Sequence, residues 1–273
     1  MDVADFFSRE FQIDITTDKD IINGYERDSS NISGNGDILC RPKNELECAL
    51  ILQWFQSAQI PMTISAGKTN LTGSATPKGG VVLSTEKMTQ PMVKVDFVAN
   101  TVSTPVGIYL EDMRKEVLRQ SNKTLHYPVD PTSREEAMVG GTLSCNASGF
   151  IPGPAGATRF WTEGLDFLTA DGNKISCRRG DYVSENGEFI LEYPDKSVIL
   201  TIPTYPRPEI KNASGPFSDV NGRIDLVDFL VGSEGIFGVI TSAIFALKEM
   251  PDDFLDLFFT LPNELDAVHF HQY

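Results

Sequence analysis

The sequence has too few basic residues to bind a large polyanion across its surface. It holds 23 lysine and arginine residues against 38 aspartate and glutamate residues, for a formal net charge of −15. Such a charge repels the phosphate backbone of nucleic acids and the surface of anionic membranes. We therefore exclude nucleic acid as a partner and expect any anionic ligand to be held by a local group of donors.

Long apolar runs are also missing. No hydrophobic stretch approaches the length of a transmembrane helix. The sequence starts Met1-Asp2-Val3-Ala4-Asp5, with acidic residues where a secretory signal peptide carries basic ones. These features predict a cytoplasmic protein.

Cysteine and histidine are both scarce. The cysteines show no CxxC spacing, which predicts free thiols rather than a zinc site or a disulfide framework; they are Cys40, Cys48, Cys145 and Cys177. The only histidines are His126, His269 and His271. We predict no metal site and assign no catalytic residue.

Apolar residues are plentiful enough for a core, since 41% of the 273 residues are hydrophobic. The length favours one large domain or two lobes that share a site. Changes in pattern along the chain predict an arm at 1–36, a first lobe at 37–96, a second lobe at 97–250 and the start of a further domain at 251–273.

Hydrophobic periodicity predicts alternating strands and helices. We expect strands at 37–40, 62–65, 81–84, 92–96, 101–105, 164–170 and 174–176, a strand that ends near 247, and another at 254–261. Helices are expected at the start of the arm, after Asn44, at 109–119, before Gly140, at 224–230 and after Asn263. The turn residues Asp171-Gly172-Asn173 predict a hairpin between the strands at 164–170 and 174–176. One side of the helix at 109–119 is apolar, at Leu110, Met113, Val117 and Leu118. The segment 178–223 has little periodicity.

The helix after Asn44 has the clearest local signals. Asn44 and Glu47 have the spacing of an N-terminal cap. Its apolar positions recur at helical spacing at Leu46, Leu50, Trp54 and Ala58. Together with the strands at 37–40 and 62–65 it predicts a βαβ unit, whose strands are parallel.

The stretch 66–73, AGKTNLTG, follows an expected strand and has no helical period. A glycine-containing loop in this place can turn successive backbone N–H groups toward one point and bind a phosphate or pyrophosphate. A nucleotide triphosphate P-loop would need glycine where Met62 stands and a helix after Thr69. An ordinary turn between two strands is the other interpretation.

A second informative region begins at 127–133, YPVDPTS, where two prolines favour extended chain. Ser133 and Glu136 have the spacing of a capping box for a short helix that runs into Gly140 and Gly141. The paired glycines indicate either a flat ligand against the backbone or close packing of helix on strand. Elsewhere in the chain, Gly34-Asn35-Gly36 does not extend into a Rossmann fingerprint, because Leu39 stands where the third glycine of that motif would be.

Three blocks, taken in order, resemble the FAD-binding domain of the vanillyl-alcohol oxidase (PCMH-type) superfamily. They are AGKTNLTG at 66–73, YPVDPTS with GGTLSCNASG at 127–149, and KNASG at 211–215 followed by DLVDFLVGSEGIFGVIT at 225–241. The resemblance covers roughly 37–250 and is to the FAD-linked D-lactate, glycolate and D-2-hydroxyglutarate dehydrogenases. It implies an α+β fold of two lobes with FAD between them, truncated here at the start of a cap domain.

The resemblance also implies which residues hold the cofactor. The pyrophosphate would lie against Gly67, Lys68, Thr69, Asn70, Leu71, Thr72 and Gly73. The flavin and its ribityl chain would be bordered by Pro128, Asp130, Pro131 and Thr132. The second lobe would contribute Gly140, Gly141, Ser144, Asn146 and Gly149, with Gly235 and Ile240 near the adenine.

Two positions depart from the family pattern. Relatives often have glycine where Lys68 stands, so this side chain is expected either to add a cation near the phosphates or to point to solvent. Relatives with covalent flavin carry histidine where Thr69 stands, which implies that FAD is held noncovalently.

The implied activity is an FAD-dependent dehydrogenase of a small 2-hydroxy acid. The family's substrate-binding and catalytic residues lie in the continuation of the chain, so we expect FAD binding with weak or no turnover in isolation. Such a dehydrogenase would work as a truncated chain or with a second polypeptide that supplies the cap. A flavin-binding electron-transfer component and an inactive remnant are the alternatives. An incomplete cap would expose apolar surface, which predicts a homo-oligomer.

Overall fold

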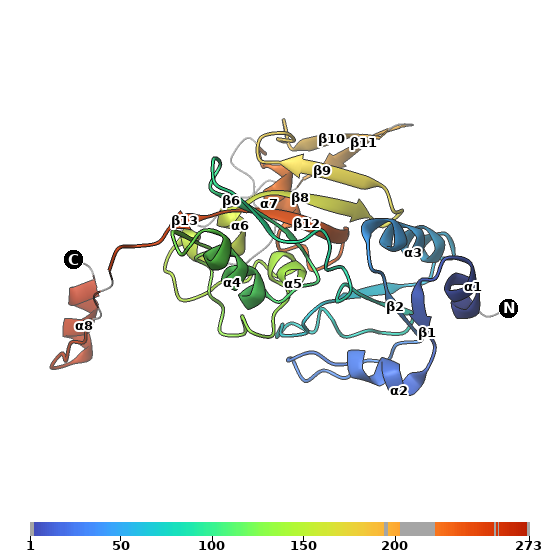
Figure 1. The fold of residues 1–273 in the computed structure, drawn as a ribbon, viewed down its shortest axis with the longest axis horizontal. Coiled ribbons are helices and arrows are strands. Elements are labelled where there is room, and N and C mark those ends of the chain that lie inside the picture. Colours follow the sequence, from blue (N-terminus) through green and yellow to red (C-terminus); the bar gives the residue numbers. More distant parts are fainter. Residues whose placement is uncertain (1–2, 194–195, 203–221, 254, 256, 272–273) are drawn as a thin grey trace.

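The computed structural model describes residues 3–193, 196–202, 222–253, 255 and 257–271. Two larger β-sheets lie side by side, with helices packed around them (Figure 1). The helices are α1 (Val3–Glu10), α2 (Lys19–Ile22), α3 (Glu45–Ser57), α4 (Leu110–Gln120), α5 (Val139–Ser144), α6 (Thr158–Trp161), α7 (Leu226–Leu230) and α8 (Glu264–His271). Short 3₁₀ turns occur at Asn23–Tyr25 and Pro154–Gly156.

The first sheet has four strands in the order β1-β2-β4-β3. Its strands are β1 (Asp14–Thr16), β2 (Ile38–Arg41), β3 (Met62–Ser65) and β4 (Val81–Ser84). Strands β2 and β3 both pair with β4 in parallel, and β1 pairs with β2 antiparallel. The predicted parallel βαβ unit is confirmed, although β4 lies between its two strands.

Helix α3 begins where the sequence predicted. The Asn44 side chain accepts a hydrogen bond from the Glu47 backbone N–H at 2.9 Å, which satisfies an unpaired donor of the first turn. The stripe buried on the sheet, however, consists of Cys48, Ile51, Leu52 and Phe55. Of the stripe singled out from the sequence, Leu46 (71% exposed) and Trp54 (45% exposed) lie at the surface, whereas Leu50 is partly buried against the core.

The second sheet has five strands in the order β5-β6-β12-β8-β9, and every neighbouring pair is antiparallel. Its strands are β5 (Lys94–Asp96), β6 (Thr101–Pro105), β8 (Thr162–Thr169), β9 (Lys174–Arg178) and β12 (Gly238–Ala246). The hairpin predicted around 171–173 joins β8 to β9. Of the apolar face predicted for α4, Leu110, Met113 and Val117 are buried and Leu118 is half-buried.

The expected capping box at Ser133 is wrong. Ser133 accepts hydrogen bonds from the backbone N–H groups of Glu136 and Ala137, which makes a turn rather than a helix. Met138 is extended and forms a β-bridge with Tyr109, so α5 begins only at Val139. Pairing with a distant segment therefore overrides the local signal, and the paired glycines lie within α5 itself.

Two small sheets complete the fold. One pairs β7 (Leu125–His126) with β13 (Lys248–Glu249), and the other pairs β10 (Glu188–Glu192) with β11 (Ser197–Thr201), inside the segment where little periodicity was found. Residues 203–221, including the block 211–215, lie outside the described residues.

The C-terminal segment leads away from both sheets. Residues 257–261 form no strand, contrary to expectation, whereas α8 begins after Asn263 as predicted. Figure 1 shows α8 standing apart from the rest of the molecule, at the opposite end from the N-terminus. No helix in the described ranges is both long and apolar enough to cross a bilayer.

Candidate cofactor site

A cleft of about 860 Å³, partly open to solvent, lies between the carboxyl end of β3, helix α5 and the beginning of β12. Three segments that are distant in sequence form its walls, at 64–75, 133–147 and 234–240. Half of the residues implied by the resemblance line it: Gly67, Lys68, Thr69, Asn70, Gly140, Gly141, Ser144, Gly235 and Ile240.

The 66–75 loop leaves a run of main-chain donors available. Within the described part of the chain, none of the backbone N–H groups from Gly67 to Ser74 donates a hydrogen bond to another protein group. Backbone amides that are not used by the protein are suited to bind an anion, and a phosphate can accept from several of them at once. The loop therefore fits the pyrophosphate of a dinucleotide.

Gly67 also joins the two halves of the site. A Cβ added at this position would lie 2.4 Å from the Glu136 carbonyl oxygen and 3.0 Å from the Met138 backbone nitrogen. Only glycine allows the loop to approach the 136–138 segment this closely. The absence of a side chain here serves contact between the loop and the 136–138 segment as well as access to the cleft.

The two glycines of α5 have different surroundings. A Cβ on Gly140 would lie 3.0 Å from the Val106 Cβ, so this glycine permits close packing of the helix. A Cβ on Gly141 would meet only the Ala66 Cβ, at 3.4 Å, at the edge of the cleft. Both interpretations left open by the sequence thus apply, one to each glycine.

Lys68 is held by the N-terminal arm, a placement that the sequence did not predict. Its backbone has a positive φ of 57°, and its Nζ donates to the Gly24 carbonyl oxygen at 2.7 Å. The same ammonium lies 4.4 Å from the centre of the Tyr25 ring, which is a cation–π contact.

The remaining implied residues do not line this cleft: Leu71, Thr72, Gly73, Pro128, Asp130, Pro131, Thr132, Asn146 and Gly149. Asp130 and Gly149 hold two loops together, because the Asp130 Oδ1 accepts from the Phe150 N–H and a Cβ on Gly149 would lie 2.0 Å from that oxygen. The Asn146 Oδ1 accepts from the Arg159 N–H, while its buried Nδ2 has no partner among the described residues.

Sequence reasoning missed several residues of the wall. The Ser65 hydroxyl is buried at the end of β3 and has no partner in the described part of the chain, so it can bind a ligand atom. The Glu234 carboxylate accepts from the Thr72 hydroxyl at 3.2 Å and links the loop to the second lobe. Both stand next to predicted positions, which was the only signal that could have found them.

The cleft contains no activated nucleophile among its described walls. Cys145 lines it, but burial, together with the nearby carboxylates of Glu234 and Asp28, raises the pKa of its thiol to about 11. The thiol is therefore protonated at neutral pH.

The described residues offer few groups for acid–base or metal chemistry at the cleft. His126 lies on β7 outside the cleft, and burial lowers its pKa, helped by the positive charges of Lys248 and Arg114. No group of three His, Cys, Asp or Glu side chains that could hold a metal ion occurs among the described residues.

Comparison with known families and proteins gives matches over most of the chain. A family model described as "FAD binding domain" matches residues 36–178. The D-lactate dehydrogenase of Archaeoglobus fulgidus is 29% identical over 233 residues, which are 85% of this chain and 43% of that protein. The D-2-hydroxyglutarate dehydrogenase of Stutzerimonas stutzeri is 24% identical over 91% of this chain and 46% of its own length.

Other relatives and solved structures agree. The glycolate oxidase subunit GlcD of Bacillus subtilis is 28% identical over 79% of this chain and 38% of its own length. A solved structure of alkyldihydroxyacetonephosphate synthase shares the fold with a TM-score of 0.63 at 18% identity, over 88% of this chain and 38% of that one. The chain spans less than half of the length of these relatives.

Proposed function

This chain belongs to the FAD binding domain family, and we propose that it is the flavin-binding part of an oxidoreductase that acts on a small 2-hydroxy acid. FAD is the cofactor that family membership assigns. The observation that carries the proposal is the 66–75 loop. Its backbone amides from Gly67 to Ser74 donate to no other group in the described part of the chain, and a pyrophosphate needs several such donors. The names of the relatives point to D-lactate, glycolate or D-2-hydroxyglutarate as the substrate class.

Each wall of the cleft has a part in this proposal. The loop amides and the Ser65 hydroxyl bind the pyrophosphate, while Gly235 and Ile240 border the adenine. The 128–132 segment, which lies outside the cleft itself, borders the flavin. Bound FAD would supply the two-electron acceptor for oxidation of a 2-hydroxy acid to a 2-oxo acid, in which the carbon loses a hydride and the hydroxyl group a proton. With threonine at position 69, the cofactor is held noncovalently.

The first experiment tests cofactor binding. The purified protein, reconstituted with FAD and desalted, is expected to keep the visible absorbance of flavin. After acid precipitation the flavin should appear in the supernatant, because no covalent bond retains it. Colourless protein after reconstitution would contradict the proposed function, and flavin in the pellet would contradict noncovalent binding.

The second experiment tests the substrate class. Under anaerobic conditions, D-lactate, glycolate and D-2-hydroxyglutarate are each added to the FAD-loaded protein, and bleaching of the flavin band is followed. We propose that rapid bleaching requires a cap domain, supplied by further chain or by a second polypeptide. Rapid bleaching by the 273-residue chain alone would overturn the need for a cap.

The alternative of a flavin-binding electron-transfer component has a distinct outcome. In that case no 2-hydroxy acid would bleach the flavin even with the cap present, while a reduced protein partner would. A cytoplasmic location is likewise a proposal, and fractionation of cells that express the chain tests it.

A further inference from the structure

The N-terminal arm contributes a segment, residues 24–32, that packs against the 66–75 loop. Its main chain and side chains contact the loop at several points. The Ser29 N–H donates to the Lys68 carbonyl oxygen at 3.0 Å, and the Lys68 ammonium donates to the Gly24 carbonyl oxygen. A Cβ added at Gly73 would lie 2.9 Å from the Ile32 Cδ1. The arm segment thus forms the outer support of the loop.

Asp28 is the centre of this support. It is only 8% exposed, and both oxygens of its carboxylate accept hydrogen bonds. One oxygen, Oδ2, accepts from the Asn70 Nδ2 at 2.7 Å and from the Ala75 N–H at 3.3 Å. The other, Oδ1, accepts from the Ser30 N–H at 2.9 Å and from the Ser30 hydroxyl.

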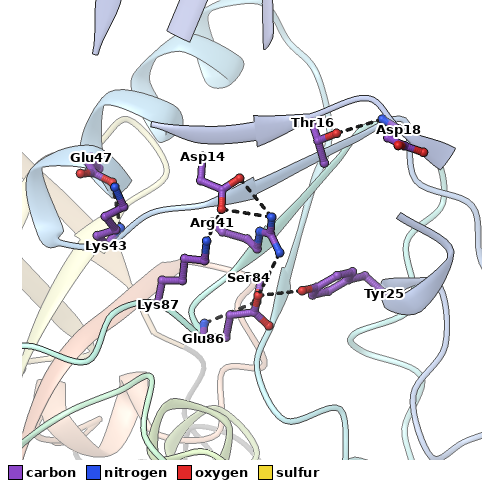
Figure 2. A network of polar contacts seen from close by, with 10 residues as sticks. All are labelled: Asp14, Thr16, Asp18, Tyr25, Arg41, Lys43, Glu47, Ser84, Glu86 and Lys87. Carbon is purple, nitrogen blue, oxygen red and sulfur yellow. Dashed lines mark hydrogen bonds and ion pairs between the residues drawn. The ribbon is translucent and has the colours of Figure 1, made fainter. Parts of the chain in front are cut away.

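The arm segment is itself fixed to the first sheet. The Tyr25 hydroxyl donates to the Glu86 carboxylate at 2.7 Å, and Glu86 pairs with Arg41 at 3.6 Å. Arg41 in turn bonds Asp14 of β1 (Figure 2). Because Tyr25 stands three residues before Asp28, this network also anchors the chain next to Asp28 to the first sheet.

The geometry points to Asp28 as a positioning residue for FAD: its buried carboxylate holds Asn70 and Ala75, and so fixes the loop while leaving the amides of residues 67–70 and of Ser74 to the pyrophosphate. A carboxylate cannot bind a phosphate directly, since the two charges repel. Its effect on the cofactor therefore passes through the loop. This inference rests on the proposed function.

The test replaces the carboxylate by the amide of the same shape. Asp28→Asn keeps one acceptor oxygen but removes the negative charge. Its new side-chain NH₂ group would face groups that donate to Asp28 in the unaltered protein, such as the Asn70 Nδ2 or the Ser30 N–H. We expect FAD to bind about 10- to 100-fold more weakly, the loss typical of one or two hydrogen bonds to a charged group. Affinity is measured by titrating ligand-free protein with FAD and following flavin fluorescence.

A purely structural role is separated by a second readout and two further variants. Amide hydrogen exchange of ligand-free Asp28→Asn should rise at Ala75 and Ser30, whose backbone N–H groups donate to the Asp28 carboxylate, and stay unchanged in the strands of the second sheet. Asp28→Glu, which keeps the carboxylate, should recover part of the affinity. Asp166→Asn serves as the control, because that carboxylate is also held by hydrogen bonds but lies away from the cleft.

The outcomes are distinct. Unchanged FAD affinity in Asp28→Asn, or equal losses in Asp28→Asn and Asp28→Glu, would overturn the role of the carboxylate. If Asp28→Asn does not fold, Asn70→Ala tests the same contact from the loop side, and unchanged affinity there overturns the proposal as well. Failure of the unaltered protein to bind FAD would contradict the proposed function, whereas the exchange measurement tests the support of the loop without ligand.

Discussion

Gly67 lies where the 66–75 loop approaches the 136–138 segment. Its missing side chain leaves room for the Glu136 carbonyl oxygen, which would lie 2.4 Å from an added Cβ. Real Cβ atoms do not come this close to a backbone oxygen, so any larger residue must displace the loop or the 136–138 segment.

Gly67→Ala is accordingly expected to lower the free energy of unfolding by about 1–3 kcal/mol, the usual cost of overpacking. FAD affinity should fall as well, because the loop that carries the amides has to move. Urea unfolding and FAD titration measure the two effects. The control is Gly24→Ala, where no atom lies within 4 Å of the added Cβ. Equal free energies of unfolding of the two variants would show that the 136–138 segment can move aside without loss of stability.

Strand β1 is held in the first sheet by charged contacts as well as by its pairing with β2. It has only three residues, and Asp14 binds both Arg41 of β2 and Lys87 beyond β4 (Figure 2). Partial burial by itself would raise the pKa of Asp14, but the hydrogen bonds from Lys87 and Arg41 outweigh it and hold the pKa below 3.8. The strand is thus fastened to the sheet by an ionised carboxylate.

The sign of the pH dependence follows from the lowered pKa. The carboxylate contributes stability in full at pH values above 3.8, its ordinary value, and loses it as the pH falls through the lower folded-state pKa. Asp14→Asn should therefore lower the free energy of unfolding at pH 7 by about 1–3 kcal/mol, and the difference from the unaltered protein should shrink in strong acid.

Urea unfolding at a series of pH values measures this difference. Asp252→Asn is the control, because Asp252 is exposed and has no partner in the described part of the chain. A difference that stays constant down to the lowest pH would mean that Asp14 does not act through its charge.

The whole molecule has two sheets that meet at the cleft and share few charged contacts. One link joins Glu45 of α3 to Lys174 of β9 at 2.8 Å and to the Thr241 hydroxyl of β12, also at 2.8 Å. A ligand that touches the loop on one side and α5 and β12 on the other adds a second link. The α+β class predicted from the sequence is confirmed by the family match and by the shared fold of the solved structures.

FAD should therefore stabilise both sheets together. A ligand present at one hundred times its dissociation constant stabilises the folded state by about 2.7 kcal/mol. We expect calorimetry to show one transition that shifts to higher temperature as FAD increases. Riboflavin, which lacks the pyrophosphate, is the matched control and should shift the transition far less. An equal shift by riboflavin would contradict pyrophosphate binding by the loop.

The C-terminal segment predicts self-association. Phe258 is 97% exposed and Leu255 is 81% exposed, and further apolar side chains of this segment and of α8 are exposed near them. Sedimentation at rising protein concentration should reveal oligomers, and Phe258→Asp should shift them toward monomer. A clean monomer at every concentration would contradict the expectation.

Much of the architecture was decided by local sequence. The Asn44 cap, the parallel β2 and β3, the 171–173 hairpin and the buried face of α4 follow from signals within a few residues, because capping and alternation act at short range. The composition of the 66–75 loop likewise indicated an anion site before its surroundings were known.

Other features depended on contacts between distant segments. Helix α3 is apolar on more than one side, and only the position of the first sheet selected Cys48, Ile51, Leu52 and Phe55 for the core. The Met138 bridge to Tyr109 replaced an expected helix with extended chain. Asp28 lies some forty residues before its partners in the loop, and no periodicity connects residues at that separation. The sequence by itself determined the class of fold and the glycine-containing composition of the 66–75 loop. Tertiary structure alone decided what supports that loop, because buried hydrogen bonds select their partners by position in space.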